Sequence, residues 1–369
     1  MAFDLHTASA TGRLDDMLQC FERFVNRAGE GGATALSFAV RHGQVDAATL
    51  LIDRGADVEK ARTDCFTPLM VACQYDQVDA AALLLDRGAE INRARRNTGA
   101  TPLYIAAQCG HQRAAQLCLD RGADVDRALD TTGDTPLYVA CTFDHVGVAT
   151  LLLDRGAARD RANVTGFSPL HIACQFGCTN AVRLLLDRGA EIEQTAESPT
   201  TPLYTACATG HTDVVRLLLN RGADFARAVH GGWVALHIAC SRGHIDAARL
   251  LLERGSDIHQ TAASGATALS CARKKDRATM AAWLARIQKS GWTQQLAEPR
   301  YKLAVLREHL AQGRHNGKLK PFEVNPRLLG RHLPDELFKR IVRYYWGGGL
   351  WAAEEAAVAA KPAAAPPKR

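Results

Sequence analysis

Cysteine and histidine are the residue types in this 369-residue chain that could do chemistry, with 11 cysteines and 13 histidines. Thiolates and imidazoles bind zinc, or serve as nucleophile and base in catalysis. Five cysteines recur at one register, six residues after a repeated Thr, Ser or Val: Cys73, Cys141, Cys174, Cys207 and Cys240. Another segment of the chain with the same pattern has Ala107 at this position, and Cys271 lies two residues before it in a further copy. A position that takes Cys or Ala is typical of a small buried site, where free Cys packs as a hydrophobic residue.

The spacing of these cysteines argues against a metal or a disulfide. Successive copies would lie about 10 Å apart if neighbouring segments pack as helices do, which is too far for a bond or a shared ion. Cys174 and Cys178 are four residues apart, but no second pair with ligand spacing accompanies them. We therefore expect no metal, no cofactor and free thiols. Free thiols indicate a reducing compartment, the cytoplasm with the nucleus as the alternative.

Histidines recur beside a turn, at His42, His111, His145, His211 and His244. Catalytic groups converge on one point, whereas these residues repeat at one register. We expect each imidazole to hydrogen-bond the backbone of the neighbouring segment and so to fix the packing. The chain also has no Gly-rich phosphate loop, nucleophile elbow or distinctive pair of carboxylates. An enzyme built on Cys and His is the alternative, but the sequence predicts a protein that is not an enzyme.

The elements that carry these residues repeat along the chain. Arg-Gly-Ala or Arg-Gly-Ser triplets recur every 33 or 34 residues, with glycine at 55, 88, 122, 156, 189, 222 and 255. Such a period is typical of a helix–turn–helix unit that buries its apolar face against the next copy. Each unit opens with an N-cap residue followed by Pro-Leu or Ala-Leu: Thr34, Thr67, Thr101, Thr135, Ser168, Thr201, Val234 and Thr267. We call these the opening residues, and we expect the triplet glycine to end each second helix in the left-handed conformation.

The opening motif resembles that of the ankyrin repeat, Thr-Pro-Leu-His with Ala two residues on, and the segment from Ser168 to Ala173 nearly matches it. The resemblance covers residues 4 to 289, with eight units and a degenerate first one. It implies an all-α solenoid of stacked helix–turn–helix units with hairpin-like loops. We expect an ankyrin array at 1–289, a helix and linker at 290–331, a short helix at 332–347 and a disordered Ala/Pro-rich tail at 348–369.

Side chains that vary between units predict the binding surface. In ankyrin arrays, the residue before the opening residue and those seven or eight after it lie on a concave face that contacts partners. Here these positions include Phe66, Tyr75, Phe143, Phe167, Phe176, Trp233 and Arg242. Aromatic and Arg side chains dominate interface energetics, and the chain as a whole is only 6% aromatic. The resemblance therefore implies a protein partner on the concave face. The alternative is that some of these aromatics pack on the adjacent loop and support stacking.

Two of the loops between units differ from the rest. The segments 88–101 and 122–135 are one residue longer than their counterparts, and insertions in repeat proteins fall in loops, often on the binding face. The first of them carries a small basic cluster, Arg93, Arg95 and Arg96. This cluster is either a solvated surface or a contact for an acidic segment.

The net positive charge of the chain lies in its C-terminal tail. Residues 300–369 hold 14 Lys and Arg against 6 Asp and Glu, a net +8, so residues 1–299 carry −2 of the total +6. The basic excess is therefore no argument that the array binds nucleic acid, and we expect no nucleic-acid partner. No segment approaches the roughly 18 apolar residues of a membrane span. We expect a monomer that does not bind membranes.

The tail contains one amphipathic segment, from Leu333 to Trp346. It resembles the opening helix of an F-box, although the later F-box helices are missing. The positions that carry the resemblance are Leu333, Pro334, Leu337, Phe338, Ile341 and Val342. F-boxes dock an adaptor of cullin-type ubiquitin ligases, so the resemblance implies a substrate receptor whose repeats select the target. The alternative is a helix that folds back and caps the array.

Overall fold

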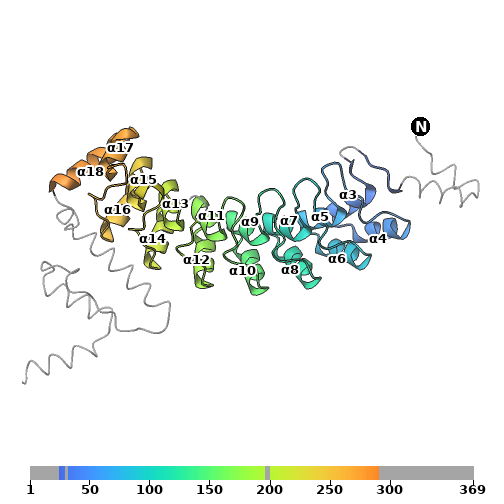
Figure 1. Ribbon diagram of the computed structural model, residues 1–369. Helices are drawn as coiled ribbons and strands as arrows, with labels where there is room; N and C mark the ends of the chain where they lie inside the picture. Colours follow the sequence, from blue (N-terminus) through green and yellow to red (C-terminus); the bar gives the residue numbers. More distant parts are fainter. Residues whose placement is uncertain (1–24, 30–31, 196–199, 291–369) are drawn as a thin grey trace, which may run out of the picture. The chain divides into compact units, whose positions relative to one another are not determined.

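The computed structural model describes residues 25–29, 32–195 and 200–290, which form eight helix pairs and no sheet (Figure 1). A single isolated antiparallel bridge joins Thr261 to Thr267. The first helices are α3 (Ala35–Arg41), α5 (Pro68–Gln74), α7 (Pro102–Cys109), α9 (Pro136–Thr142), α11 (Pro169–Phe176), α13 (Pro202–Thr209), α15 (Ala235–Arg242) and α17 (Ala268–Lys274). The second helices are α4 (Val45–Asp53), α6 (Val78–Asp86), α8 (Gln112–Asp120), α10 (Val146–Asp154), α12 (Thr179–Asp187), α14 (Thr212–Asn220), α16 (Ile245–Glu253) and α18 (Ala278–Ser290). A short 3₁₀ turn, η2 (His230–Gly232), precedes α15.

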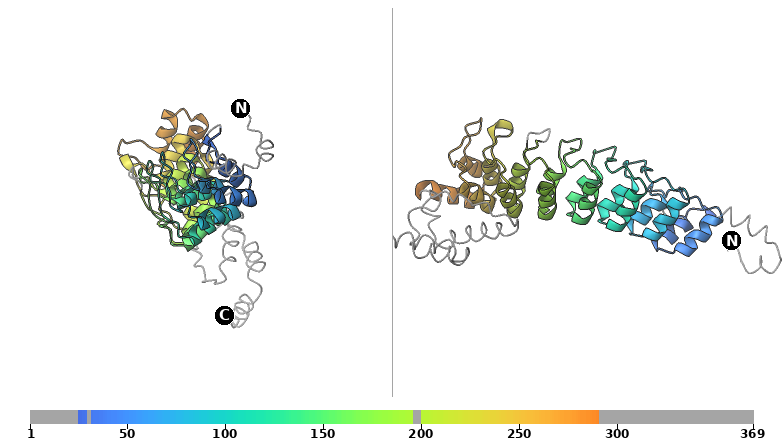
Figure 2. Two further views of the ribbon diagram at one scale, coloured as in Figure 1. Left: turned by 90° about the vertical axis from the view of Figure 1, so that its right-hand side faces the viewer. Right: turned by 90° about the horizontal axis from the view of Figure 1, so that it is seen from below.

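The chain divides into two compact units, 1–286 and 287–369, and the helix pairs belong to the first apart from the end of α18. The pairs follow one another in chain order, and the loops between them project on one side of the stack (Figure 2). Each first helix contacts the first helices before and after it, and the second helices from α4 to α16 do the same. The fold class expected from the repeat, an all-α stack of helix pairs, is confirmed.

The opening residues start the first helices as the sequence predicts. The hydroxyl of Thr67 accepts a hydrogen bond from the Met70 amide at 3.3 Å, and that of Ser168 accepts one from the His171 amide at 3.4 Å. The same N-cap bond forms at Thr34, Thr101, Thr135, Thr201 and Thr267. Proline is tolerated in the first turn because its missing N–H has no acceptor there.

A left-handed glycine follows each second helix from α4 to α16. Gly122 follows α8 with φ of +85°, and the other triplet glycines are left-handed too. In the first unit the Ala56 amide reaches back to the Leu51 carbonyl at 2.9 Å, the bond of a Schellman cap. A Cβ added at Gly122 would meet nothing within 4 Å, so only the backbone conformation requires glycine there.

The core lies between successive helix pairs. The leucine two residues after each opening residue is at most 1% exposed from Leu36 to Leu236, and second-helix leucines such as Leu84 and Leu152 are fully buried as well. Because every buried side chain packs on its own unit or a neighbouring one, stability accumulates along the stack.

An ion-pair ladder joins the ends of successive second helices. The arginine of each triplet reaches the last acid of the preceding second helix, as in Arg155 to Asp120 at 2.7 Å and Arg188 to Asp154 at 2.7 Å. The same contact recurs at Arg87, Arg121 and Arg221, and Arg254 meets Asn220 instead. Exposed pairs contribute little each, so the ladder serves mainly to fix the register between units.

The loops between units end in tight turns. In most of them the carbonyl just before the opening residue accepts a backbone hydrogen bond from four residues earlier, as from Asn163 to Phe167 at 3.0 Å. In the two longer loops the bond spans five residues, from Arg95 to Ala100 and from Leu129 to Asp134. The extra residue of each insertion therefore lies in the turn at the loop's end, as expected.

Candidate functional site

Three of the predicted binding aromatics are exposed at the ends of first helices. Tyr75, Phe143 and Phe176 stand eight residues after their opening residues and are 37%, 53% and 55% exposed. Arg242 holds the same register in α15 and is also exposed. We call the residues seven and eight after each opening residue the first-helix face. Tyr75 lies under the guanidinium of Arg41 in the preceding unit, 4.8 Å from its carbon, and the Phe143 ring lies 5.9 Å from that of His145. More than half of Phe143 and of Phe176 nevertheless stays exposed.

The other three predicted aromatics are half-buried against their own chain. Phe66 lies under the Arg95 guanidinium, 4.5 Å from its carbon, and Arg95 Nε also donates to the Asp64 carbonyl at 2.8 Å. Phe167 meets His171 edge-on at 5.4 Å between ring centroids, and Trp233 lies 5.9 Å from His237. Only part of each ring is available to a partner. The seven predicted residues thus divide into exposed ends of first helices and rings that support the loops.

The turn histidines bind the backbone of the preceding unit, as the sequence analysis expected. His111 Nε2 lies 3.0 Å from the Gln74 carbonyl oxygen, and the same contact recurs at His145, His211 and His244 with distances of 3.0 to 3.2 Å. Where a unit has no histidine at this place, Gln77 Nε2 or the Cys178 thiol donates to the equivalent carbonyl at 3.4 Å. These histidines therefore hold units in register.

His171 and His237, the motif histidines, are buried and bonded at both ring nitrogens. Nδ1 of His171 accepts the Ser168 amide at 3.3 Å, so its Nε2–H donates to the Thr200 carbonyl at 3.0 Å. His237 makes the same two hydrogen bonds, accepting the Val234 amide at Nδ1 and donating from Nε2 to the Gln260 carbonyl. Burial lowers the pKa of both imidazoles, which are therefore neutral at neutral pH. Tyrosine replaces this histidine in three units, and in one of them Tyr138 OH accepts a hydrogen bond from Asn163 at 3.3 Å.

The repeated cysteines are buried thiols. Burial raises the pKa of Cys141, Cys174, Cys207 and Cys240 well above the ordinary value, so these sulfurs are protonated and weakly reactive. Cys178, the partner considered for a metal with Cys174, donates to a backbone carbonyl instead. Among the described residues no group of three or more His, Cys, Asp or Glu is placed to hold a metal ion.

One cysteine contact escaped the sequence reasoning. Cys73 Sγ and Cys118 Sγ lie 3.6 Å apart in the core between α5 and α8. Cys118 occupies a second-helix position that holds Leu84 and Leu152 in sister units, so comparing first-helix cysteines alone could not find it. The sequence feature that could have indicated this contact is the thiol of Cys118 at a position where other units have leucine. The hydrogen bond with Cys118, together with burial, raises the pKa of Cys73.

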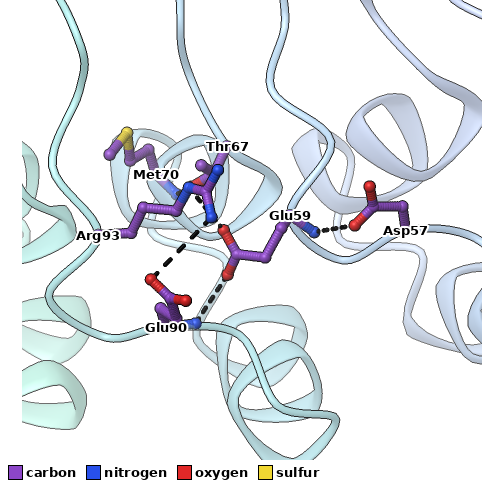
Figure 3. A network of polar contacts seen from close by, with 6 residues as sticks. All are labelled: Asp57, Glu59, Thr67, Met70, Glu90 and Arg93. Atoms are coloured by element: carbon purple, nitrogen blue, oxygen red, sulfur yellow. Dashed lines mark hydrogen bonds and ion pairs between the residues drawn. The ribbon is translucent and has the colours of Figure 1, made fainter.

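Two arginines of the predicted basic cluster, Arg93 and Arg95, contact other parts of the array, and Figure 3 shows the contacts of Arg93. Arg93 Nε lies 3.0 Å from a Glu59 carboxylate oxygen, and the other oxygen accepts the Glu90 amide at 2.7 Å. Desolvation raises the pKa of Glu59 in spite of these contacts. Arg95 is stacked on Phe66, which leaves Arg96 as the exposed member. The cluster mainly joins adjacent loops.

The predicted adaptor-docking residues lie outside the described part of the chain. They are Leu333, Pro334, Leu337, Phe338, Ile341 and Val342. The predicted segments 332–347 and 348–369 lie there as well, and so does 290–331 apart from Ser290, the last residue of α18. Within the described ranges, none of the helices has the length and apolar character needed to cross a membrane.

Helix pairs that repeat their caps, turns and ladders every 33 or 34 residues define a helical repeat protein. The family model described as Ankyrin repeats (3 copies) matches almost all of this array, in overlapping segments at 5–95, 60–128, 89–163, 122–196, 158–229, 194–262 and 225–294. The chain belongs to the ankyrin repeat family.

A solved structure supports the same family. The crystal structure of the human ASB11 ankyrin repeat domain is similar to this chain with a TM-score of 0.54 and 28% sequence identity. The match covers 61% of this chain and 99% of that one. No curated protein matches the sequence.

Proposed function

We propose that the array is a non-enzymatic interaction module that binds a protein partner on its first-helix face. Ankyrin repeats are generally protein-binding modules. The observation that carries the proposal is the exposure of Phe143 and Phe176, at 53% and 55%, on consecutive units. Large exposed rings are typical of the anchors that dominate protein interfaces.

Affinity capture from a cell lysate tests this assignment. Phe143→Ser with Phe176→Ser removes both rings and should abolish capture of the proteins that the unaltered chain retains. The matched control is Leu50→Ser, because Leu50 is 53% exposed but lies on second helix α4. This control should retain the same proteins. Capture that is unchanged by the double substitution would contradict the proposal.

A second candidate is narrower: a substrate receptor that docks a ubiquitin-ligase adaptor through the segment from Leu333 to Trp346. What supports it is the F-box-like pattern of the sequence. The apolar residues that recur every four positions in this segment form its apolar stripe: Leu333, Leu337, Ile341 and Tyr345. In the full chain, Leu337→Asp with Ile341→Asp places two charges in this stripe, where burial of an unpaired charge costs several kcal/mol. Recovery of adaptor and cullin should then be lost.

The control for that test is Lys339→Asp with Arg343→Asp, which also adds acids but spares the stripe. It should keep most of the adaptor. If the segment caps the array instead, no adaptor is recovered from any chain, and the stripe variant melts at a lower temperature than the control. Strong hydrogen-exchange protection of the segment in the isolated protein would argue for the cap as well.

A further inference from the structure

The charges on the first helices all have one sign. From α3 to α17 these eight described helices contain no Asp or Glu, and their Lys and Arg residues are Arg41, Arg242, Arg273 and Lys274. Lys275 caps the last of them. His171 and His237 are neutral because burial lowers their pKa. The acids of the array lie instead on the second helices, in turns and in the loops between units. Every charged side chain on the first-helix face is therefore a cation.

The cations are also unevenly placed along the array. The middle of the first-helix face carries rings and amides, among them Tyr75, Gln108, Phe143, Gln175 and Phe176. Near the C-terminal end, Arg242, Arg273, Lys274 and Lys275 are all exposed. No ion pair in the described part of the chain engages Arg242, Lys274 or Lys275.

Acids near this end do not neutralise it. Asp246 pairs with Arg249 at 3.6 Å on α16, and Asp257 accepts the His259 amide within its own loop. Asp276 is exposed in the turn after Lys275, but Arg277 follows it directly. A positive surface therefore remains on the face that carries the exposed rings, two to three units beyond Phe176, and it is complementary to a segment that combines apolar and acidic residues.

We propose that the first-helix face binds an extended partner segment with two apolar residues that contact Phe143 and Phe176 and an acidic stretch that reaches Arg242, Lys274 and Lys275. This inference rests on the proposed function and adds the chemistry of the partner. The chain's own tail is a poor occupant, because residues 300–369 carry a net +8 and would be repelled.

The repeat spacing sets the register of such a segment. Neighbouring units stack about 10 Å apart, and an extended chain advances about 3.3 Å per residue, so one unit corresponds to about three residues. Phe143 and Phe176 are one unit apart, which places the two apolar residues about three apart. Arg242 and Lys275 lie two and three units beyond Phe176. The acids should therefore stand about six to nine residues from the second apolar residue.

Selection from a random peptide library displayed on phage tests the inference with the full chain as bait. The recovered peptides should be enriched in acidic residues at about this spacing from an apolar pair. The combined substitution Arg242→Glu, Lys274→Glu and Lys275→Glu should turn the enrichment towards Lys and Arg. The matched control is Arg113→Glu with Arg183→Glu, because these two arginines are exposed on second helices α8 and α12. This control should keep the acidic preference.

A labelled peptide from the selection then gives affinities. The triple substitution should weaken its binding about tenfold or more, and higher salt should weaken binding to the unaltered chain, since exposed charges are screened. Binding that depends on Phe143 and Phe176 but shows no acidic preference overturns this inference and leaves the proposed function standing. Binding that depends on neither the rings nor the cations, or a library that yields no binder, overturns both.

Discussion

At the scale of single residues, the triplet glycine is needed for its backbone conformation alone. Gly122 has φ of +85° and open space around it, so a side chain there is penalised without a clash. Gly122→Val should lower the free energy of unfolding by about 1–2 kcal/mol, and Gly122→Asn by less, because Asn tolerates the left-handed region. Denaturant unfolding of the three proteins measures this. Equal midpoints for valine and glycine would disprove the cap.

The buried motif histidines predict a pH dependence of stability. The folded-state pKa of His171 and His237 is lowered, so in the unfolded chain these imidazoles protonate first as pH falls. Their stabilisation is complete above the ordinary histidine pKa of about 6.5 and is lost as pH falls towards the lowered folded-state pKa, because the unfolded chain binds protons that the folded chain does not. Melting temperatures between neutral and acidic pH measure the loss.

The sister units supply a control for this pH effect. Tyr104 and Tyr138 occupy the same register, so His171→Tyr with His237→Tyr should fold and should show a smaller decline in melting temperature with acid. An unchanged decline would mean that other groups cause it.

Residues also mark the limit of what the sequence could predict. The N-caps, the triplet glycines and the bonds of the turn histidines followed from repetition, because each is a local requirement met in many units. The contact of Cys73 with Cys118 did not, because it depends on which side chains of two different helices meet in the core. Likewise, the sequence left open which aromatics bind a partner and which support stacking. The period gives the register of Phe167 and Trp233 but does not say that their rings lie half-buried beside His171 and His237.

At the scale of helices and loops, the two groups of aromatics should respond differently to truncation. Phe176→Ala removes an exposed ring and should change the free energy of unfolding by no more than about 0.5 kcal/mol, while binding to a captured partner weakens by about 2 kcal/mol. Trp233→Ala should cost about 1 kcal/mol of stability because its ring contacts His237. Denaturant melts and titrations of both variants separate these effects. A larger stability loss for Phe176→Ala than for Trp233→Ala would reverse the assignment.

The helices themselves were the most predictable part of the fold, and their surface chemistry the least. Pro-Leu openings and Arg-Gly-Ala ends set the helix bounds in unit after unit. The sequence analysis interpreted Arg93 and Arg95 as part of a solvated or partner-binding cluster. In the structure, Arg93 instead pairs with Glu59 and Arg95 stacks on Phe66, both in the preceding loop. Such contacts link residues about one unit apart, and the period alone does not say which side chains face the gap between units.

At the scale of the whole array, each unit is supported only by its neighbours, so damage should stay local. Leu137 is fully buried in α9, and Leu137→Ala should cost about 2–5 kcal/mol through lost packing and a cavity. Hydrogen exchange should then accelerate most in α9 and in the helices beside it, α7, α8, α10 and α11. The effect should decline towards α4 and α16, because the energy of a stack is a sum over units and nearest-neighbour interfaces.

Leu50→Ala, a truncation of an exposed leucine, is the control and should leave the exchange pattern unchanged. Equal acceleration in every helix after Leu137→Ala would show instead that the units unfold as one cooperative domain.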